Sequence, residues 1–213
     1  SYFEGLSKLL ATFDLPKWRS WLIWHVLSGA SPYLSSEFVN ENFNFYGTTL
    51  SGIPKLKDRW KRGVGLVEGA LGEAVGQIYV ERHFGEIAKS KMVELVANLI
   101  KAYRVSIEGL SWMSQETKER AYIKLEKFTP KIGYPDKWRD YSALEIKAGD
   151  LIGNLAQIAK YSQEYEYNKI GKPVDKSEWY MTPQTVNAYY NPGMNEIVFP
   201  AAILQPPFFD VNA

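Results

Sequence analysis

Two histidines, His25 and His83, are the side chains best suited to ligate a metal ion or to act as a general base. Neither belongs to an H-E-x-x-H pattern, which would place two imidazoles on one face of a helix around zinc. His25 lies among tryptophans and is expected to be a partly buried, hydrogen-bonded core residue, whereas His83 is expected on the surface near a helix end. The sequence has no cysteine, so thiol catalysis, thiolate-bound metal and disulfides are excluded. Because the carboxylates also show no paired spacing for general acid–base work, we predict no metal ligand and no catalytic residue in this chain.

A phosphate-binding loop is a second candidate for chemistry. Gly63-Val64-Gly65 begins a glycine series, but the third glycine of a dinucleotide-binding fingerprint is missing and no strand precedes it. The basic run within residues 55–62 has no series of base-stacking aromatics beside it, so a solvated helix face is expected. The net charge of +1 gives no field that would attract nucleic acid or anionic lipid. We therefore predict no nucleic-acid partner.

Two short runs near the end of the chain could bind a peptide. Residues 185–190 and 196–199 are β-branched and aromatic and flank the turn sequence Asn191-Pro192-Gly193, which predicts a hairpin. An extended peptide could add to such an edge through main-chain hydrogen bonds, and the amide of Asn187 could both donate and accept beside Ala188. An edge strand that the rest of the molecule buries fits the same pattern equally well.

Apolar residues at helical spacing predict helices along most of the chain, and glycine or proline marks the ends of several. The strongest pattern lies in residues 86–110, where the apolar positions share one face and Lys and Glu occupy the others. Tryptophans and leucines at similar spacing predict a buried helix over residues 15–29. The other predicted helices cover residues 33–46, 55–84, 114–128 and 143–167. The polar turn Gly47-Thr48-Thr49 is expected to follow the helix over residues 33–46. Ser114 is a good N-cap for the helix over residues 114–128, and Pro130 and Gly133 are expected to close it.

The helix predicted over residues 55–84 contains a regular glycine series. Gly65, Gly69, Gly72 and Gly76 recur every three or four residues. They leave one helical face nearly free of side chains, along which another backbone can approach closely.

These elements define the predicted fold class. With 213 residues and 46% hydrophobic content, the chain is long enough to close one good core, or one core plus a small appendage. We predict a mainly α fold, with a multi-helix domain over residues 1–175 and a short β-hairpin segment over residues 176–213. An isolated two-stranded hairpin is marginal in water, so that segment is too small to fold alone. No apolar run approaches the ~20 residues that a membrane helix needs, so no membrane segment is expected.

The hairpin region carries a family resemblance. The stretch VNAYYNPGMNEIVFPAAILQPPFF, from Val186 to Phe209, closely resembles the segment that precedes the zinc helix in neprilysin-like metallopeptidases of family M13. Upstream, FYGT at 45–48, AVGQIYVE at 74–81, LSWM at 110–113 and IGYP at 132–135 are also similar to the family. The resemblance therefore covers nearly the whole chain.

The resemblance implies roles for particular residues. In that family the matching strand binds the backbone of a substrate peptide, which assigns this role to the side chain of Asn187 and the main chain of Ala188. Positions matching Ile203 and Phe208 line a pocket for a bulky hydrophobic residue after the scissile bond. The resemblance thus implies a zinc-dependent endopeptidase that binds a peptide substrate, with residues 176–213 as the start of its catalytic domain.

The resemblance also implies that this chain is a fragment of its parent enzyme. The zinc cofactor's H-E-x-x-H helix, its third ligand and the general-base glutamate are expected beyond Ala213, in a C-terminal catalytic half with which this chain would pair. We therefore expect the isolated chain to be inactive. Without that half, Ile203, Leu204, Phe208 and Phe209 would form an apolar patch that self-associates, refolds against the body or becomes disordered. Dimerisation or domain swapping through residues 180–213 is predicted.

The absence of cysteine departs from the disulfide-rich vertebrate members and points to a bacterial relative. A cytoplasmic location is expected ahead of a periplasmic or secreted one. The alternative function is a non-catalytic helical scaffold or peptide-binding module that uses no zinc. An H-E-x-x-H sequence following residue 213 would distinguish the enzyme from this alternative.

Overall fold

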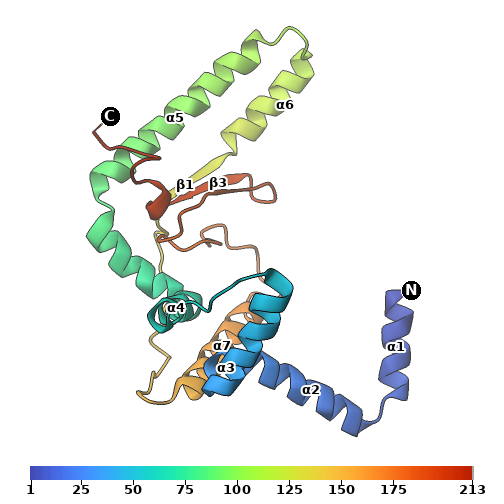
Figure 1. The fold of residues 1–213 in the computed structure, drawn as a ribbon. Coiled ribbons are helices and arrows are strands. Elements are labelled where there is room, and N and C mark those ends of the chain that lie inside the picture. The colour runs from blue at the N-terminus through green and yellow to red at the C-terminus, as the bar shows by residue number, and fades with distance from the viewer. Residues whose placement is uncertain (213) are drawn as a thin grey trace. The chain divides into compact units, whose positions relative to one another are not determined.

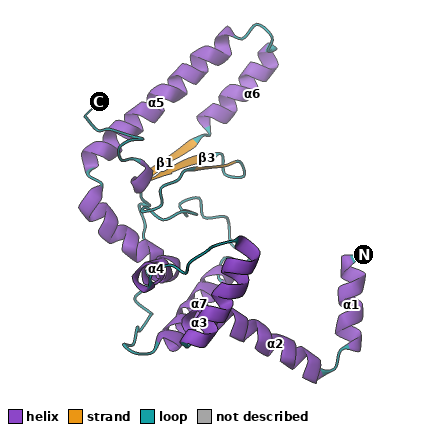
Figure 2. Cartoon of the chain, viewed as in Figure 1, coloured by secondary structure: helices purple, strands orange, loops and turns teal. Residues whose placement is uncertain are grey.

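Helices make up most of the computed structural model, which describes residues 1–212, and the strands form one small sheet (Figures 1 and 2). The predicted mainly α fold class is therefore confirmed. In chain order the elements are α1 Tyr2–Thr12, α2 Leu15–Ala30, the 3-10 helix η1 Ser31–Tyr33, α3 Ser36–Asn42, the π-helix η2 Phe43–Thr49, α4 Arg59–His83, α5 Glu86–Gly109, α6 Gln115–Glu126, β1 Thr129–Gly133, α7 Leu151–Tyr167, β2 Tyr189–Asn191, β3 Glu196–Pro200 and the 3-10 helix η3 Ala201–Ile203.

The chain divides into two compact units. Unit 1 comprises Ser1–Arg62 and Lys147–Leu155, and unit 2 comprises Gly63–Ile146 and Ala156–Ala213. The predicted division into residues 1–175 and 176–213 is a division by family domain and stays a prediction. No helix among residues 1–212 combines the length and apolar character that crossing a bilayer requires.

The first helix of unit 1 was not among the predicted elements, although its sequence carries a capping signal. The hydroxyl of Ser1 accepts a hydrogen bond from the Glu4 amide at 3.3 Å, and the Glu4 carboxylate accepts one from the Ser1 amino group at 2.7 Å. This reciprocal pair satisfies donors that a helix start leaves free. The S-x-x-E spacing could therefore have predicted α1.

The prediction of a buried helix over residues 15–29 is right about the helix and wrong about its burial. No residue of α2 is buried, and Trp21 and Trp24 are 51% and 56% exposed. His25 is exposed as well; its ring contacts those of Trp21 and Trp24, and none of residues 1–212 hydrogen-bonds to it. The expectation that His25 is a hydrogen-bonded core residue is thus wrong, because α2 carries apolar side chains that the described residues do not cover.

The next helical stretch is longer than predicted, because the turn expected at Gly47-Thr48-Thr49 is part of η2. The hydroxyl of Thr49 donates to the carbonyl of Asn44 at 2.9 Å, and the hydroxyl of Ser51 donates to the carbonyl of Tyr46 at 2.7 Å. Each hydroxyl thereby satisfies a carbonyl group five residues earlier in the chain. Such segments are rare and often mark functional positions.

In unit 2 only part of the glycine-lined face of α4 is contacted by another segment of the chain. Gly72 and Gly76 are buried. A Cβ at Gly72 would lie 2.7 Å from the methyl group of Thr182, and a Cβ at Gly76 would lie 2.8 Å from the Pro183 ring. Gly65 and Gly69 have no such neighbour within 4 Å among residues 1–212. The prediction of a close backbone approach is therefore confirmed for Gly72 and Gly76 and wrong for the other two.

This difference gives a paired test. Gly76→Ala is expected to lower the free energy of unfolding by about 1–3 kcal/mol, because the new methyl forces Pro183 away. Gly69→Ala adds a methyl where there is space and is expected to raise stability by up to about 1 kcal/mol through helix propensity. Urea denaturation of both variants measures the two effects, and equal changes would contradict the described packing.

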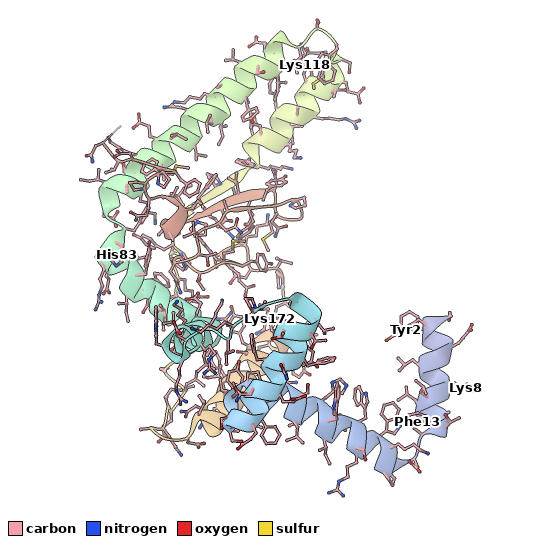
Figure 3. The ribbon with its side chains drawn as sticks, in the orientation of Figure 1. Tyr2, Lys8, Phe13, His83, Lys118 and Lys172 are labelled. Carbon is pink, nitrogen blue, oxygen red and sulfur yellow. The ribbon has the colours of Figure 1, made fainter. Side chains whose placement is uncertain are left out.

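The helices α5 and α6 form an antiparallel hairpin, visible in Figure 1. Ser114 caps α6 by accepting from the Thr117 amide at 3.3 Å, as its position in the sequence predicts. Lys118, labelled in Figure 3, donates from Nζ to the carbonyl of Glu108 at 2.7 Å and so ties α6 to the end of α5. The helix predicted from residue 143 begins only at Leu151, because Asp150 caps it by accepting from the Gly153 amide at 2.9 Å.

The sheet has three strands in the order β1-β3-β2. The predicted hairpin is present, with β2 antiparallel to β3, but its first strand begins at Tyr189 rather than at residue 185. β1 runs parallel to β3, and Lys131 lies beside Val198. This strand was not predicted, because Pro130 and Gly133 were interpreted as breakers after α6.

The core of unit 2 joins the sheet to α4 and α5. Its buried members are Phe84, Met92, Val96, Ile132, Ala201 and Leu204. Ile203 and Phe209 pack against this cluster, whereas Phe208 is 69% exposed. Of the outcomes expected for the terminal apolar residues, the structure shows packing against the body for all except Phe208. The dimerisation prediction stays a prediction, but the bare patch on which it rested is largely absent.

Candidate functional site

Asn187 and Ala188 lie directly before β2, which is an edge strand of the sheet. Asn187 is exposed and Ala188 is half-buried. The Asn187 amide N–H donates to the carbonyl of Thr185 at 3.0 Å, and its side-chain Oδ1 accepts from the Ala188 amide at 2.8 Å. The side-chain Nδ2 of Asn187 has no hydrogen-bond partner among residues 1–212 and is free to donate to a ligand. The prediction that Asn187 and Ala188 lie within a strand is wrong by one or two residues, but neither is sealed in a core.

The segment before Asn187 is held on α4 by one carboxylate. Glu68 accepts a hydrogen bond from the Thr182 hydroxyl at 2.7 Å and another from Nε2 of Gln184 at 2.7 Å. The same Nε2 donates to the carbonyl of Gly72 at 2.8 Å. These three hydrogen bonds fix the segment against α4. No feature of the sequence near Glu68 indicated this role, because its partners are far along the chain.

Two further contacts close this segment on the sheet. The Tyr180 amide donates to the phenol oxygen of Tyr189 at 3.0 Å, and the Ala202 amide donates to the carbonyl of Pro183 at 2.9 Å. Burial raises the pKa of Tyr189 above its usual value, so the phenol stays neutral at physiological pH. The backbone that carries Asn187 is therefore fixed before any ligand arrives.

Ile203 and Phe208 lie on the other side of β3 in the sequence, within or after η3. Ile203 is partly buried against the core, and Phe208 is exposed. Both are apolar and neither is fully enclosed. Their assignment to a pocket for a hydrophobic substrate residue stays a prediction.

The described residues do not fit a zinc site. Within residues 1–212 no three His, Cys, Asp or Glu side chains gather closely enough to hold a metal ion. His25 lies in α2, and His83 lies at the end of α4, as labelled in Figure 3. The prediction of His83 near a helix end is confirmed.

An apolar hollow of about 520 Å³ lies on one face of the sheet, between α5, α6 and β2–β3. Phe199 and Ile197 contribute from β3, and among residues 1–212 Lys124 is the one charged residue that lines the hollow. Leu99 and Tyr103, on the apolar face of α5, line the hollow and do not pack into the core. They are therefore 50% and 63% exposed rather than buried. This hollow and Asn187 are both features of unit 2.

Comparison with protein families identifies two matching regions. Models described as peptidase family M13 match residues 1–135 and residues 187–213. A neutral endopeptidase of Lactobacillus helveticus is 35% identical over 99% of this chain and 33% of its own length. Human neprilysin is 32% identical over 99% of this chain and 29% of its own length. The chain spans about a third of the length of the curated relatives it matches.

Solved structures show the same similarity. A zinc metalloprotease of Mycobacterium tuberculosis in its open state is 54% identical, with a TM-score of 0.89 over 98% of this chain and 32% of that chain. A structure from Lactobacillus rhamnosis is 31% identical, with a TM-score of 0.89 over all of this chain and 34% of that chain. The fold described above is therefore shared with bacterial proteins of this kind.

Proposed function

Because this chain belongs to peptidase family M13, we propose that it supplies the peptide-binding edge of a zinc-dependent endopeptidase. The observation that carries the proposal is the position of Asn187 and Ala188 directly before the edge strand β2, where Asn187 is exposed and its Nδ2 has no partner among residues 1–212. Several relatives are named neutral endopeptidase, a name for enzymes that cut peptides, which supports a peptide as the ligand.

The edge would bind a peptide in an extended conformation. Main-chain groups of the peptide would pair with the backbone near Ala188, as in other cases of strand addition to a sheet. The free Nδ2 of Asn187 would donate to a peptide carbonyl. Because the segment is already fixed by Glu68 and Tyr189, little conformational entropy is lost on binding.

The finer substrate preference is also a proposal. Ile203 and Phe208 would contact a bulky hydrophobic residue after the scissile bond, since both are apolar and not fully enclosed. Residues 1–212 hold no cluster of metal-ligating side chains, so the zinc of such an enzyme would be held by side chains outside them. This chain would bind and orient the peptide without cleaving it.

A binding titration tests the proposal. The probe is acetyl-Gly-Phe-Leu-Gly-amide, and the reference is the same peptide with its backbone nitrogens methylated. We expect Asn187→Ala to weaken binding of the probe by about three- to tenfold, because a hydrogen bond to a neutral amide is lost. Asn168→Ala, at an exposed asparagine elsewhere in unit 2, is the matched control and should bind as wild type. Equal binding of the methylated peptide would overturn strand addition.

A further inference from the structure

The sheet face opposite the apolar hollow holds a buried ion pair. Nζ of Lys131 on β1 lies 2.6 Å from Oε2 of Glu196 on β3, and the two side chains are only 9% and 1% exposed. Ile197 and Phe199 line the hollow, so the alternation along β3 places Glu196 on the other face. Buried charges are costly to desolvate, and such a pair is weak evidence of a stabilising role by itself.

Lys131 has a second partner besides the carboxylate of Glu196. Its Nζ also donates to the backbone carbonyl of Glu178 at 2.9 Å. The side chain of Glu178 accepts from the Tyr165 hydroxyl at 3.1 Å and from Nζ of Lys169 at 2.6 Å. Glu178 begins the segment that leads to Asn187, which we call the 178–189 segment. The ammonium group of Lys131 thus ties the start of this segment to the sheet.

The far end of the 178–189 segment meets the same face. Tyr189 lies opposite Val198 and Asn191 lies opposite Glu196 in the antiparallel ladder, so these side chains share one face. The Tyr180 amide donates to the phenol of Tyr189 at 3.0 Å. A shift of the backbone at Glu178 would therefore be passed through Tyr180 and Tyr189 to Ala188.

We propose that Lys131 and Glu196 are positioning residues, which hold the 178–189 segment so that Asn187 and Ala188 present a ready-formed edge to a peptide. This inference rests on the proposed function of Asn187 and Ala188. Glu196 fixes the Lys131 ammonium, and the ammonium fixes the carbonyl of Glu178. A segment released at Glu178 occupies the binding conformation for only part of the time, and the apparent affinity falls by that fraction.

Stability and positioning are separated by a double variant, Lys131→Met with Glu196→Leu. Apolar side chains of similar volume can replace a buried ion pair without loss of stability. They cannot donate to the carbonyl of Glu178. We expect this variant to unfold at a urea concentration close to that of wild type but to bind acetyl-Gly-Phe-Leu-Gly-amide about tenfold more weakly. Hydrogen exchange at the Ala188 amide should be faster in the variant.

Phe199→Leu is the control, because it changes the other face of β3 and leaves the 178–189 segment untouched. It should leave peptide affinity unchanged. If wild type binds no peptide, the proposed function fails. If wild type binds and the double variant binds equally well, the positioning role is overturned while the proposed function stands. A double variant that does not fold would be replaced by Tyr189→Phe, which removes only the acceptor for the Tyr180 amide; unchanged affinity there would also overturn the role.

Discussion

Lys131→Met alone is expected to lower the free energy of unfolding by about 3–5 kcal/mol, because it leaves the carboxylate of Glu196 buried without its cation. Glu196 is 1% exposed, and its second oxygen Oε1 has no partner among the described residues. Water therefore cannot replace the lost ammonium without opening the sheet. Urea or thermal denaturation of the purified variant measures the loss.

An exposed ion pair supplies the comparison. Arg120 and Glu116 on α6 lie 2.7 Å apart, but their side chains are 78% and 76% exposed. Arg120→Met should change stability by less than about 1 kcal/mol. Similar losses in Arg120→Met and Lys131→Met would contradict the burial described for the Lys131–Glu196 pair.

Phe84→Ala is expected to cost about 3–5 kcal/mol, the range for removing a large aromatic side chain from a core. Phe84 is 5% exposed and lies at the junction of α4, α5 and β1. Its ring occupies the space where a Cβ of Gly133 would be, and Gly133 has a φ of +82° that favours glycine. Because Gly133 has no side chain, it cannot fill the cavity that removal of the Phe84 ring would leave.

The exposed Phe208 is the matched control for this prediction. Phe208→Ala removes the same atoms at a position that is 69% exposed and should change stability by no more than about 0.5 kcal/mol. Chemical denaturation of the two variants under one set of conditions gives the difference. A loss below about 1 kcal/mol for Phe84→Ala would show that the core does not depend on this ring.

Local signals predicted the helices well, and the failures have physical causes. The period of apolar residues located α5, and Ser114 located the start of α6, because both signals depend only on neighbours in the sequence. Burial of α2 was mispredicted, since a periodic apolar face shows what a helix could cover and not whether a partner is present. β1 was missed because its strand conformation depends on pairing with β3, which lies far along the chain.

The same distinction between local and long-range contacts separates the residues of the candidate site that the sequence identified from those that it did not. Asn187 and Ala188 were identified through the family resemblance of their own segment. Glu68 and Lys131 were not identified, because each acts on residues that are distant in sequence and only the fold brings them together. Spacing along the chain carries no information about such contacts. Positioning groups of this kind require a structure.

The central claim is that the edge at Asn187 and Ala188 receives an extended peptide. Backbone amide chemical shifts of the ¹⁵N-labelled chain, recorded during titration with acetyl-Gly-Phe-Leu-Gly-amide, test it most directly. We predict that the largest shifts occur in residues 186–190, with protection of amides there from hydrogen exchange. Shifts confined to the apolar hollow, at Leu99 and Tyr103, with residues 186–190 unchanged, would contradict the claim.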